Sequence, residues 1–247
     1  DIAEFCGAMI GDGWIQADGR SLFLTGDPLE DKDYYDLHMC KLVSKIIEPV
    51  KSKNFPYWGV YGISMHKKEI IKKIVTDYDL PKGKKVASAR IPKWIKSSKD
   101  NKIKFSFIRG LFDTDGGIFC QKDYTKYANE FNSKYHTKIR LRFTTISYNL
   151  NEEIFKLMTK LGFGCVKRTI KRGVFNNRNN KDIYILEINE LKSMNKFFEE
   201  VKPANPKHTT KYLIWKEFGF CPPKTTIKQR KEILKSELNP YLLYKQE

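Results

Sequence analysis

The sequence has few of the features that mark secreted, membrane-spanning or zinc-binding proteins. Its five cysteines are odd in number, widely spaced and without a Cys-x-x-Cys pair, which argues against a disulfide framework or a cysteine-type zinc site. A reducing intracellular setting (cytoplasm, nucleoid or organelle matrix) is therefore expected. No apolar run approaches the roughly 18 residues of a membrane helix, and no signal-peptide pattern is seen. The four histidines are scattered, so no histidine-based nuclease or zinc site is expected.

Acidic residues are also scarce relative to basic ones. There are 29 Asp and Glu against 46 Lys and Arg, a formal net charge of +17 on 247 residues. Such an excess points to a polyanionic partner, and nucleic acid leads because no basic amphipathic membrane anchor stands out. Hydrophobic residues make up 40% of the chain and aromatic residues 13%, which is typical of a globular protein rather than a disordered one.

The order of expected elements repeats once along the chain. Helical and extended patterns alternate as α-β-β-α-β-β-α, first over residues 1–100, which include a basic connector, and again over residues 101–220. A basic tail follows over residues 221–247. The sequence therefore predicts an α+β protein built from two pseudo-symmetric halves.

Two segments resemble each other more than the rest of the two halves do. They read F-C-G-A-M-I-G-D-G over residues 5–13 and I-R-G-L-F-D-T-D-G over residues 108–116. Small residues stand four apart in each, at Gly7 and Gly11 and at Gly110 and Thr114, so they share one face of a helix. Because glycine inside a helix costs roughly 1 kcal/mol relative to alanine, a close helix–helix contact is the expected compensation.

Each of these segments ends in Asp-Gly. The glycine is expected to take the left-handed conformation that stops a helix, which leaves Asp12 and Asp115 at helix C-termini. A carboxylate is disfavoured there by the helix dipole, and the two would also repel each other if the helices pack along their small residues. A divalent cation resolves both problems, because carboxylate oxygens are ligands that Mg²⁺ prefers.

The paired segments resemble the two signature helices of the LAGLIDADG homing endonucleases, in the single-chain form with two motifs. The second segment is the closer match, since the first has Ile10 where the second has Asp113. The resemblance spans residues 2–220 and implies a β-saddle lying in the DNA major groove. It further implies that the last acid of each motif, Asp12 or Asp115, is a catalytic metal ligand beneath a scissile phosphate. Asp113 is interpreted as a structural neighbour.

The family also places a basic residue near each scissile phosphate, after the last helix of each half. This correspondence nominates Lys207 in the second half and Lys85 in the first, with Lys84 left open. Some members have a water-organising glutamine near the end of the second strand. Gly26 and Ser147 stand there in this chain, so that role is reassigned or absent.

Side chains for reading DNA are expected on the strands. Strict alternation over residues 138–144 places Lys138, Arg140, Arg142 and Thr144 on one face, where Arg can read guanine and Lys can neutralise phosphate. Further contacts are expected at the alternating residues Lys51, Lys53, Lys167, Thr169 and Lys171, and by correspondence with the family at Gln16, Gln121, Tyr61 and Tyr184.

The resemblance implies a monomeric, site-specific endonuclease that hydrolyses one phosphodiester in each strand of a long asymmetric double-stranded DNA target, leaving short 3′ overhangs. The expected cofactor is Mg²⁺, with Mn²⁺ as a substitute and Ca²⁺ supporting binding without efficient turnover. One alternative is an RNA maturase that assists splicing of intron RNA, and another is a DNA-binding regulator with inactive motifs. Retention of both acids argues against the regulator and only mildly against the maturase. Because an intein's splicing blocks are not seen, an intron-encoded or free-standing origin is expected.

Overall fold

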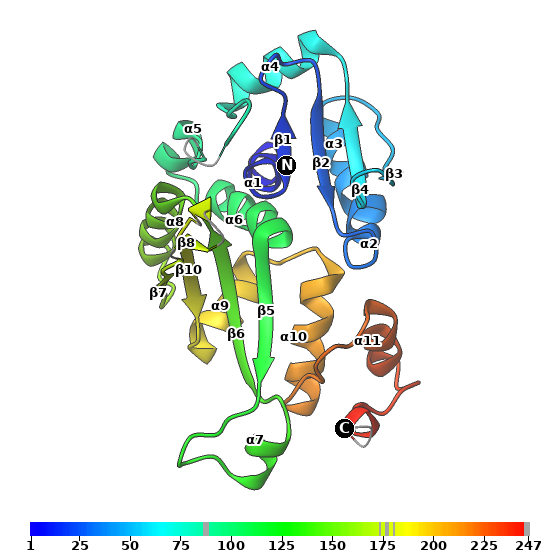
Figure 1. Cartoon of the computed structure of the whole chain (residues 1–247), viewed down its shortest axis with the longest axis vertical. Helices are drawn as coiled ribbons and strands as arrows, with labels where there is room; N and C mark the ends of the chain where they lie inside the picture. The colour runs from blue at the N-terminus through cyan, green and yellow to red at the C-terminus, as the bar shows by residue number, and fades with distance from the viewer. Residues whose placement is uncertain (86–88, 173, 176–177, 180, 245–247) are drawn as a thin grey trace.

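The computed structural model describes residues 1–85, 89–172, 174–175, 178–179 and 181–244. Two four-stranded antiparallel sheets, of order β1-β2-β4-β3 and β5-β6-β10-β7, lie on either side of a central helix pair, α1 and α6 (Figure 1). Each sheet begins directly after one of these helices. The predicted α+β class with pseudo-symmetric halves is therefore confirmed. Within the described ranges no helix is long and apolar enough to cross a membrane.

The first half runs from the N-terminus to the basic connector. Its helical segment after β2 is continuous through a π-helical stretch, η1. The elements are α1 (Ile2–Gly11), β1 (Gly13–Ile15), β2 (Leu22–Gly26), α2 (Lys32–Tyr34), η1 (Tyr35–Met39), α3 (Cys40–Ile46), β3 (Lys53–Phe55), β4 (Val60–Met65) and α4 (Lys68–Tyr78).

The second half repeats this order after a short connecting helix, α5. Three small additions, α7, β8 and β9, decorate its loops. The elements are α5 (Lys93–Ser97), α6 (Asn101–Asp115), β5 (Gly116–Gln121), α7 (Glu130–Lys134), β6 (Lys138–Thr145), α8 (Tyr148–Lys160), β7 (Val166–Ile170), β8 (Val174–Phe175), β9 (Arg178–Asn179), β10 (Ile183–Ile188) and α9 (Leu191–Glu200).

Two helices that were not predicted follow the second half. Helix α10 (Pro206–Phe218) begins with Asn205 as its cap and lies beside β5, and α11 (Ile227–Leu234) begins with a capping box between Thr226 and Gln229 (Figure 1). A last turn, η2 (Pro240–Tyr244), ends the described chain. The basic tail over residues 221–247 is thus folded onto the second half as far as residue 244, and residues 245–247 lie outside the described ranges.

Helices α1 and α6 pack backbone against backbone through their small residues. A Cβ atom at Gly7 would lie 2.1 Å from the Phe107 carbonyl oxygen, and one at Gly110 would lie 1.9 Å from the Glu4 carbonyl oxygen. Both separations are far below van der Waals contact, so only glycine fits. The close helix contact inferred from the four-residue spacing is therefore present.

The glycines that follow the two acids do not use the left-handed conformation, so that prediction is wrong. Neither Gly13 nor Gly116 has a positive φ, and Gly116 is extended at φ −84°, ψ 170°. A Cβ at Gly13 would lie 2.5 Å from Met9 Cα, and one at Gly116 would lie 2.4 Å from the Phe112 carbonyl oxygen. Glycine is needed here because the chain turns straight into a strand against its own helix.

Candidate active site

Asp12 and Asp115 come together at the C-terminal ends of the two packed helices. Asp12 caps α1, and Asp115 is the last residue of α6. Burial raises the pKa of Asp12 to about 7, and the neighbouring Asp115 carboxylate acts in the same direction. Burial also raises the pKa of Asp115, which shares a hydrogen bond with Asp12. The two motifs thus build one crowded acidic pair whose full ionisation is unfavourable without a compensating cation.

A lysine lies at the end of each motif helix. Lys85 Nζ donates to the carbonyl oxygens of Met9 (3.2 Å), Gly11 and Gly13 (2.6 Å). Lys207, at the start of α10, donates to the carbonyl oxygen of Thr114 at 3.3 Å. Gly11 and Thr114 are equivalent positions of the two motifs, so the lysines are related by the pseudo-symmetry, and each cation also complements a helix C-terminus.

The structure distinguishes the two neighbouring lysines of the first half. Lys84 is exposed, whereas burial lowers the pKa of Lys85 and the Asp115 and Asp12 carboxylates oppose that shift. Lys85 and Asp115 line the same hollow of about 310 Å³, together with Thr144 of β6. Of the two, Lys85 is therefore the one whose ammonium faces the acids.

Asp31 is an additional acid at this site that the sequence analysis did not identify. Its side chain is buried, and its Oδ1 lies 2.8 Å from Lys207 Nζ. Its Oδ2 accepts from the Asp27 amide at 2.9 Å. The same oxygen would lie only 2.5 Å from a Cβ atom at Gly26, so glycine is needed at that position. Because Asp31 fills the space beside Gly26, it stands near where the family resemblance places a glutamine. In the sequence, the sole hint of this acid was Gly26, which leaves room for the Asp31 side chain.

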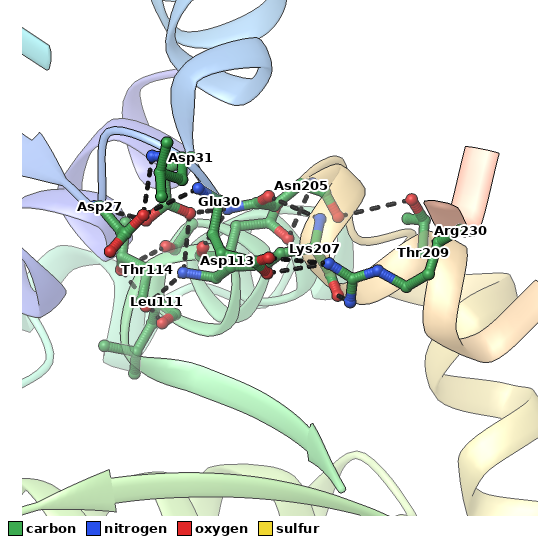
Figure 2. A network of polar contacts seen from close by, with 12 residues as sticks. Asp27, Glu30, Asp31, Leu111, Asp113, Thr114, Asn205, Lys207, Thr209 and Arg230 are labelled. Carbon is green, nitrogen blue, oxygen red and sulfur yellow. Dashed lines mark hydrogen bonds and ion pairs between the residues drawn. The ribbon is translucent and has the colours of Figure 1, made fainter. Parts of the chain in front are cut away.

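Asp113 has a structural role, as interpreted from the sequence. It is fully buried and accepts from the backbone amides of Ala204 (2.8 Å) and Asn205 (3.1 Å), while burial raises its pKa to about 7. Asn205 in turn donates to the Asp113 carbonyl oxygen and to Asp31 Oδ1, at 2.8 and 2.7 Å. Figure 2 shows this network, which fixes the start of α10 and hence Lys207.

The open face of the second sheet is basic. Lys138, Arg140, Arg142 and Thr144 lie opposite the core-facing residues of β6, so the predicted alternation is present. Glu187 of β10 is fully buried beneath the arginines and lies 2.5 Å from Arg142 Nε, 2.7 Å from Arg168 Nε and 3.7 Å from Arg140 Nη1. One carboxylate thus orients three guanidinium groups on this face.

The open face of the first sheet is aromatic instead. Trp14 stacks on Phe23 with ring centroids 5.5 Å apart, and Trp58 contacts Phe23 at 5.1 Å and Phe55 at 5.8 Å. Trp14 and Trp58 are about half exposed, at 42% and 51%. Their strand neighbours Ile15 and Leu22 point to the core, so these rings lie on the face away from it.

Four residues predicted to contact DNA lie on the helix-covered faces instead. Tyr61 is 8% exposed and donates to Asp36 at 2.6 Å, and Tyr184 packs on Tyr148 of α8. Lys167 pairs with Glu152 of α8 at 2.6 Å, and Thr169 lies opposite Tyr184. The prediction had the wrong parity for β7: Arg168 lies opposite Ile185, on the open face with Arg140 and Arg142. Because side chains alternate between the two faces of a sheet, an error of one residue assigns every side chain of the strand to the wrong face.

The remaining predicted contacts lie at strand ends. Gln16 directly follows β1 and is partly exposed, and Gln121 ends β5 opposite Lys138. Lys53 begins β3, with its ammonium 5.2 Å from the Phe55 ring, and Lys51 is exposed just before that strand. Lys171 follows β7 and pairs with Asp182 at 3.1 Å.

The donor set fits a hard divalent cation only if other ligands join the two acids. No cluster of three or more His, Cys, Asp or Glu with metal-binding geometry occurs in the described ranges. Asp12 and Asp115 supply carboxylate oxygens, and Mg²⁺ commonly takes one or two of these together with phosphate and water. The crowding of these two carboxyl groups, whose pKa values are both raised by burial, is the feature that favours such a cation.

Comparison with known proteins identifies relatives of the fold. Residues 102–202 match the model of the LAGLIDADG-like domain family. The fold is similar to I-DmoI in complex with DNA and Mn (TM-score 0.52, 15% identity, 82% of this chain and 96% of that one). It is also similar to meganuclease I-SmaMI bound to uncleavable DNA (TM-score 0.56, 11% identity, 99% and 97%). A further I-SmaMI structure, with a TM-score of 0.52, is bound to uncleaved target DNA in the presence of calcium ions.

A curated relative carries no functional description. It is the "Uncharacterized protein MJ1054" of Methanocaldococcus jannaschii, 27% identical over 208 residues, or 81% of this chain. The chain spans about a fifth of the length of that relative. The resemblance predicted from the sequence is nevertheless confirmed: residues 102–202 match a LAGLIDADG-like domain, and the fold of the chain is similar to that of the meganucleases I-DmoI and I-SmaMI.

Proposed function

We propose that this protein is a site-specific homing endonuclease that makes a double-strand break in a long, asymmetric DNA target. The observation that supports this most directly is the pair formed by Asp12 and Asp115, each accompanied by its own lysine at a helix end. An inactive DNA-binding protein would have no need to keep two half-buried carboxylates close to each other. The fold and the charge of +17 supply the DNA-binding surface around them.

Each residue has a distinct part in the proposed hydrolysis. Water forms a bond to phosphorus as one phosphorus–ester oxygen bond breaks, and the departing oxygen takes up a proton. Asp12 and Asp115 would hold the divalent cation, which supplies stabilisation of the attacking and leaving oxygens. Lys85 and Lys207 would place a positive charge beside each phosphate as negative charge develops in the transition state.

Purified protein is expected to cut duplex DNA selected from a randomised library, with activity lost in chelator and restored by Mg²⁺ or Mn²⁺. Ca²⁺ tolerates looser coordination and should support binding with little cutting. The measurement is gel analysis of both labelled strands. If no duplex is cut while intron RNA is bound tightly and spliced, the maturase alternative replaces this proposal.

The two open faces favour an asymmetric target. Arg140, Arg142 and Arg168 suit a half-site that contains guanine, because guanidinium groups bind the guanine edge in the major groove. Trp14 and Trp58 suit a half-site rich in thymine, whose methyl group accepts apolar contacts. The half-sites are therefore expected to differ in base composition as well as in sequence.

Removing thymine methyl groups is expected to weaken binding in one half-site only. Deoxyuridine in place of thymine under the first sheet should reduce affinity about fourfold per contacted methyl, since a buried methyl is worth roughly 0.8 kcal/mol. The same replacement in the other half-site is the matched control and should change little. The affinity for each substituted duplex is measured in Ca²⁺. Equal losses of affinity for the two half-sites would contradict the assignment of Trp14 and Trp58.

A further inference from the structure

Arg230 of helix α11 is a fully buried arginine that joins the two halves of the molecule. Its Nη2 lies 3.1 and 2.9 Å from the two carboxylate oxygens of Glu30, which precedes α2 in the first half. Its Nη1 donates at 3.2 Å to the carbonyl oxygen of Lys207 in α10. Figure 2 shows the guanidinium reaching from α11 towards Glu30 and the first turn of α10.

The docking of α11 explains why the guanidinium reaches this place. The capping box at Thr226 starts the helix, and Ile233 packs with Ile214 of α10 and Cys221 in a second small core. Next to Arg230, Lys231 makes an ion pair with Asp33. Both ion pairs therefore bind the same segment of the first half, but of the two cations only Arg230 is buried.

The segment held by Arg230 carries Asp31 into the acidic site. Glu30 and Asp31 are adjacent, and Asp31 Oδ1 lies 2.8 Å from Lys207 Nζ and 2.7 Å from Asn205 Nδ2. Arg230 thus contacts both ends of one short chain of contacts: the side-chain carboxylate of Glu30, the residue before Asp31, and the backbone carbonyl oxygen of Lys207. The side chain of Lys207 lies between the two.

Lys85 is held in a different way. In the described ranges its ammonium donates to main-chain carbonyl oxygens and to no carboxylate side chain. The pseudo-symmetry that relates the two lysines therefore does not extend to their supports. Loss of Arg230 would disturb the surroundings of Lys207 and leave those of Lys85 intact.

We propose that Arg230 is a positioning residue that fixes Lys207, through Glu30 and Asp31, for cleavage of one particular DNA strand. The C-terminal helix α11 is accordingly part of the active site rather than an appendage. This inference rests on the proposed nuclease function. Misplacement of a catalytic group by about 1 Å costs up to roughly 10²-fold in rate, so the strand served by Lys207 should be cut roughly 10- to 100-fold more slowly without Arg230.

The test is strand-resolved cleavage by Arg230→Met. Methionine fills a buried site without a charge, and Glu30, which is 36% exposed, can then be hydrated. A target selected by the wild-type protein carries a different fluorophore on each strand, and single-turnover rates are measured for both in Mg²⁺. Nicked duplex cut on one strand is expected to accumulate, while affinity in Ca²⁺ changes less than threefold.

Lys231→Met is the matched control, because it removes a neighbouring but exposed ion pair to the same segment and should leave the ratio of strand rates unchanged. If Arg230→Met does not fold, Arg230→Lys keeps the charge but cannot make both contacts, and it should show a smaller strand bias. Equal slowing of both strands, with a lower melting temperature, would reduce Arg230 to a structural role. Absence of cutting by the wild-type protein would instead overturn the proposed function and this assignment with it.

Discussion

Asp12→Asn and Asp115→Asn are each expected to abolish double-strand cleavage while leaving DNA binding intact. Each change removes one of the two carboxylates at the helix ends and keeps the shape of the side chain. A neutral amide cannot replace a carboxylate as a ligand for Mg²⁺, so the loss in rate should be on the order of 10³-fold or more. The measurement is single-turnover cleavage in Mg²⁺ beside affinity in Ca²⁺. Full cleavage by either variant would refute the assignment.

Although it abolishes cleavage, Asp12→Asn is expected to stabilise the metal-free protein. The pKa of Asp12 is about 7 in the folded protein, against 3.8 in an ordinary aspartic acid. Between about pH 4 and pH 7 the folded protein therefore keeps a proton on Asp12 that the unfolded chain has already lost. Stability of the metal-free protein therefore falls as pH rises from about 4 through 7. Asp12→Asn removes that contribution and should raise the melting temperature at pH 8 but not at pH 4.

Asp113→Asn provides the informative comparison. Asp113 lies on the same helix but accepts two backbone amides from the segment before α10. An amide in its place can offer only one acceptor oxygen and would leave an amide unsatisfied, so this variant should lose stability by about 1–3 kcal/mol. Destabilisation by Asp113→Asn together with stabilisation by Asp12→Asn would show that Asp113 has a structural role and that Asp12 is kept at a cost in stability.

The fold could be predicted because its signals are local and occur twice. Spacing of small residues in residues 5–13 and 108–116 defined the helix pair, and alternation over residues 138–144 defined a strand with its correct faces. Helices α10 and α11 were missed although Pro206 and the Thr226 capping box are ordinary start signals, because neither helix belongs to the repeat. The conformation of Gly13 was missed because packing, rather than φ, required glycine there.

The site could be predicted only where one motif carries it. Asp12, Asp115 and the lysines at the helix ends stand in or after repeated segments. Arg230 lies 200 residues after Glu30, the neighbour of Asp31, and the two form their ion pair only in the folded chain. Tyr35 is similar: its buried hydroxyl has no hydrogen-bond partner in the described ranges and lies near Asp12 and Asp31. No local pattern predicts contacts of this kind.

Gly110→Ala is expected to destabilise the protein strongly, although helix propensity alone predicts the reverse. Alanine is favoured over glycine inside a helix by roughly 1 kcal/mol. Here the new methyl would lie 1.9 Å from the Glu4 carbonyl oxygen and 2.8 Å from the Ala8 amide nitrogen, both backbone atoms of α1. Backbone cannot rotate away as a side chain can, so the two helices must separate along their whole contact.

The magnitudes decide the sign. Overpacking costs about 1–3 kcal/mol where side chains can adjust and more where only backbone could move, so we expect a gross cost of about 3–5 kcal/mol here. Subtracting the helix-propensity gain of roughly 1 kcal/mol leaves a net loss of about 2–4 kcal/mol. At about 2–4 °C per kcal/mol for a chain of this size, the melting temperature should fall by roughly 5–15 °C. Gly164→Ala is the matched control, since its methyl would meet only the movable side chains of Glu190 and Ser193. Separating α1 from α6 also moves Asp12 away from Asp115. Gly110→Ala should therefore lower the pKa of Asp12 and reduce the affinity of the acidic pair for divalent cations. Unchanged stability would mean that the helices do not pack backbone to backbone.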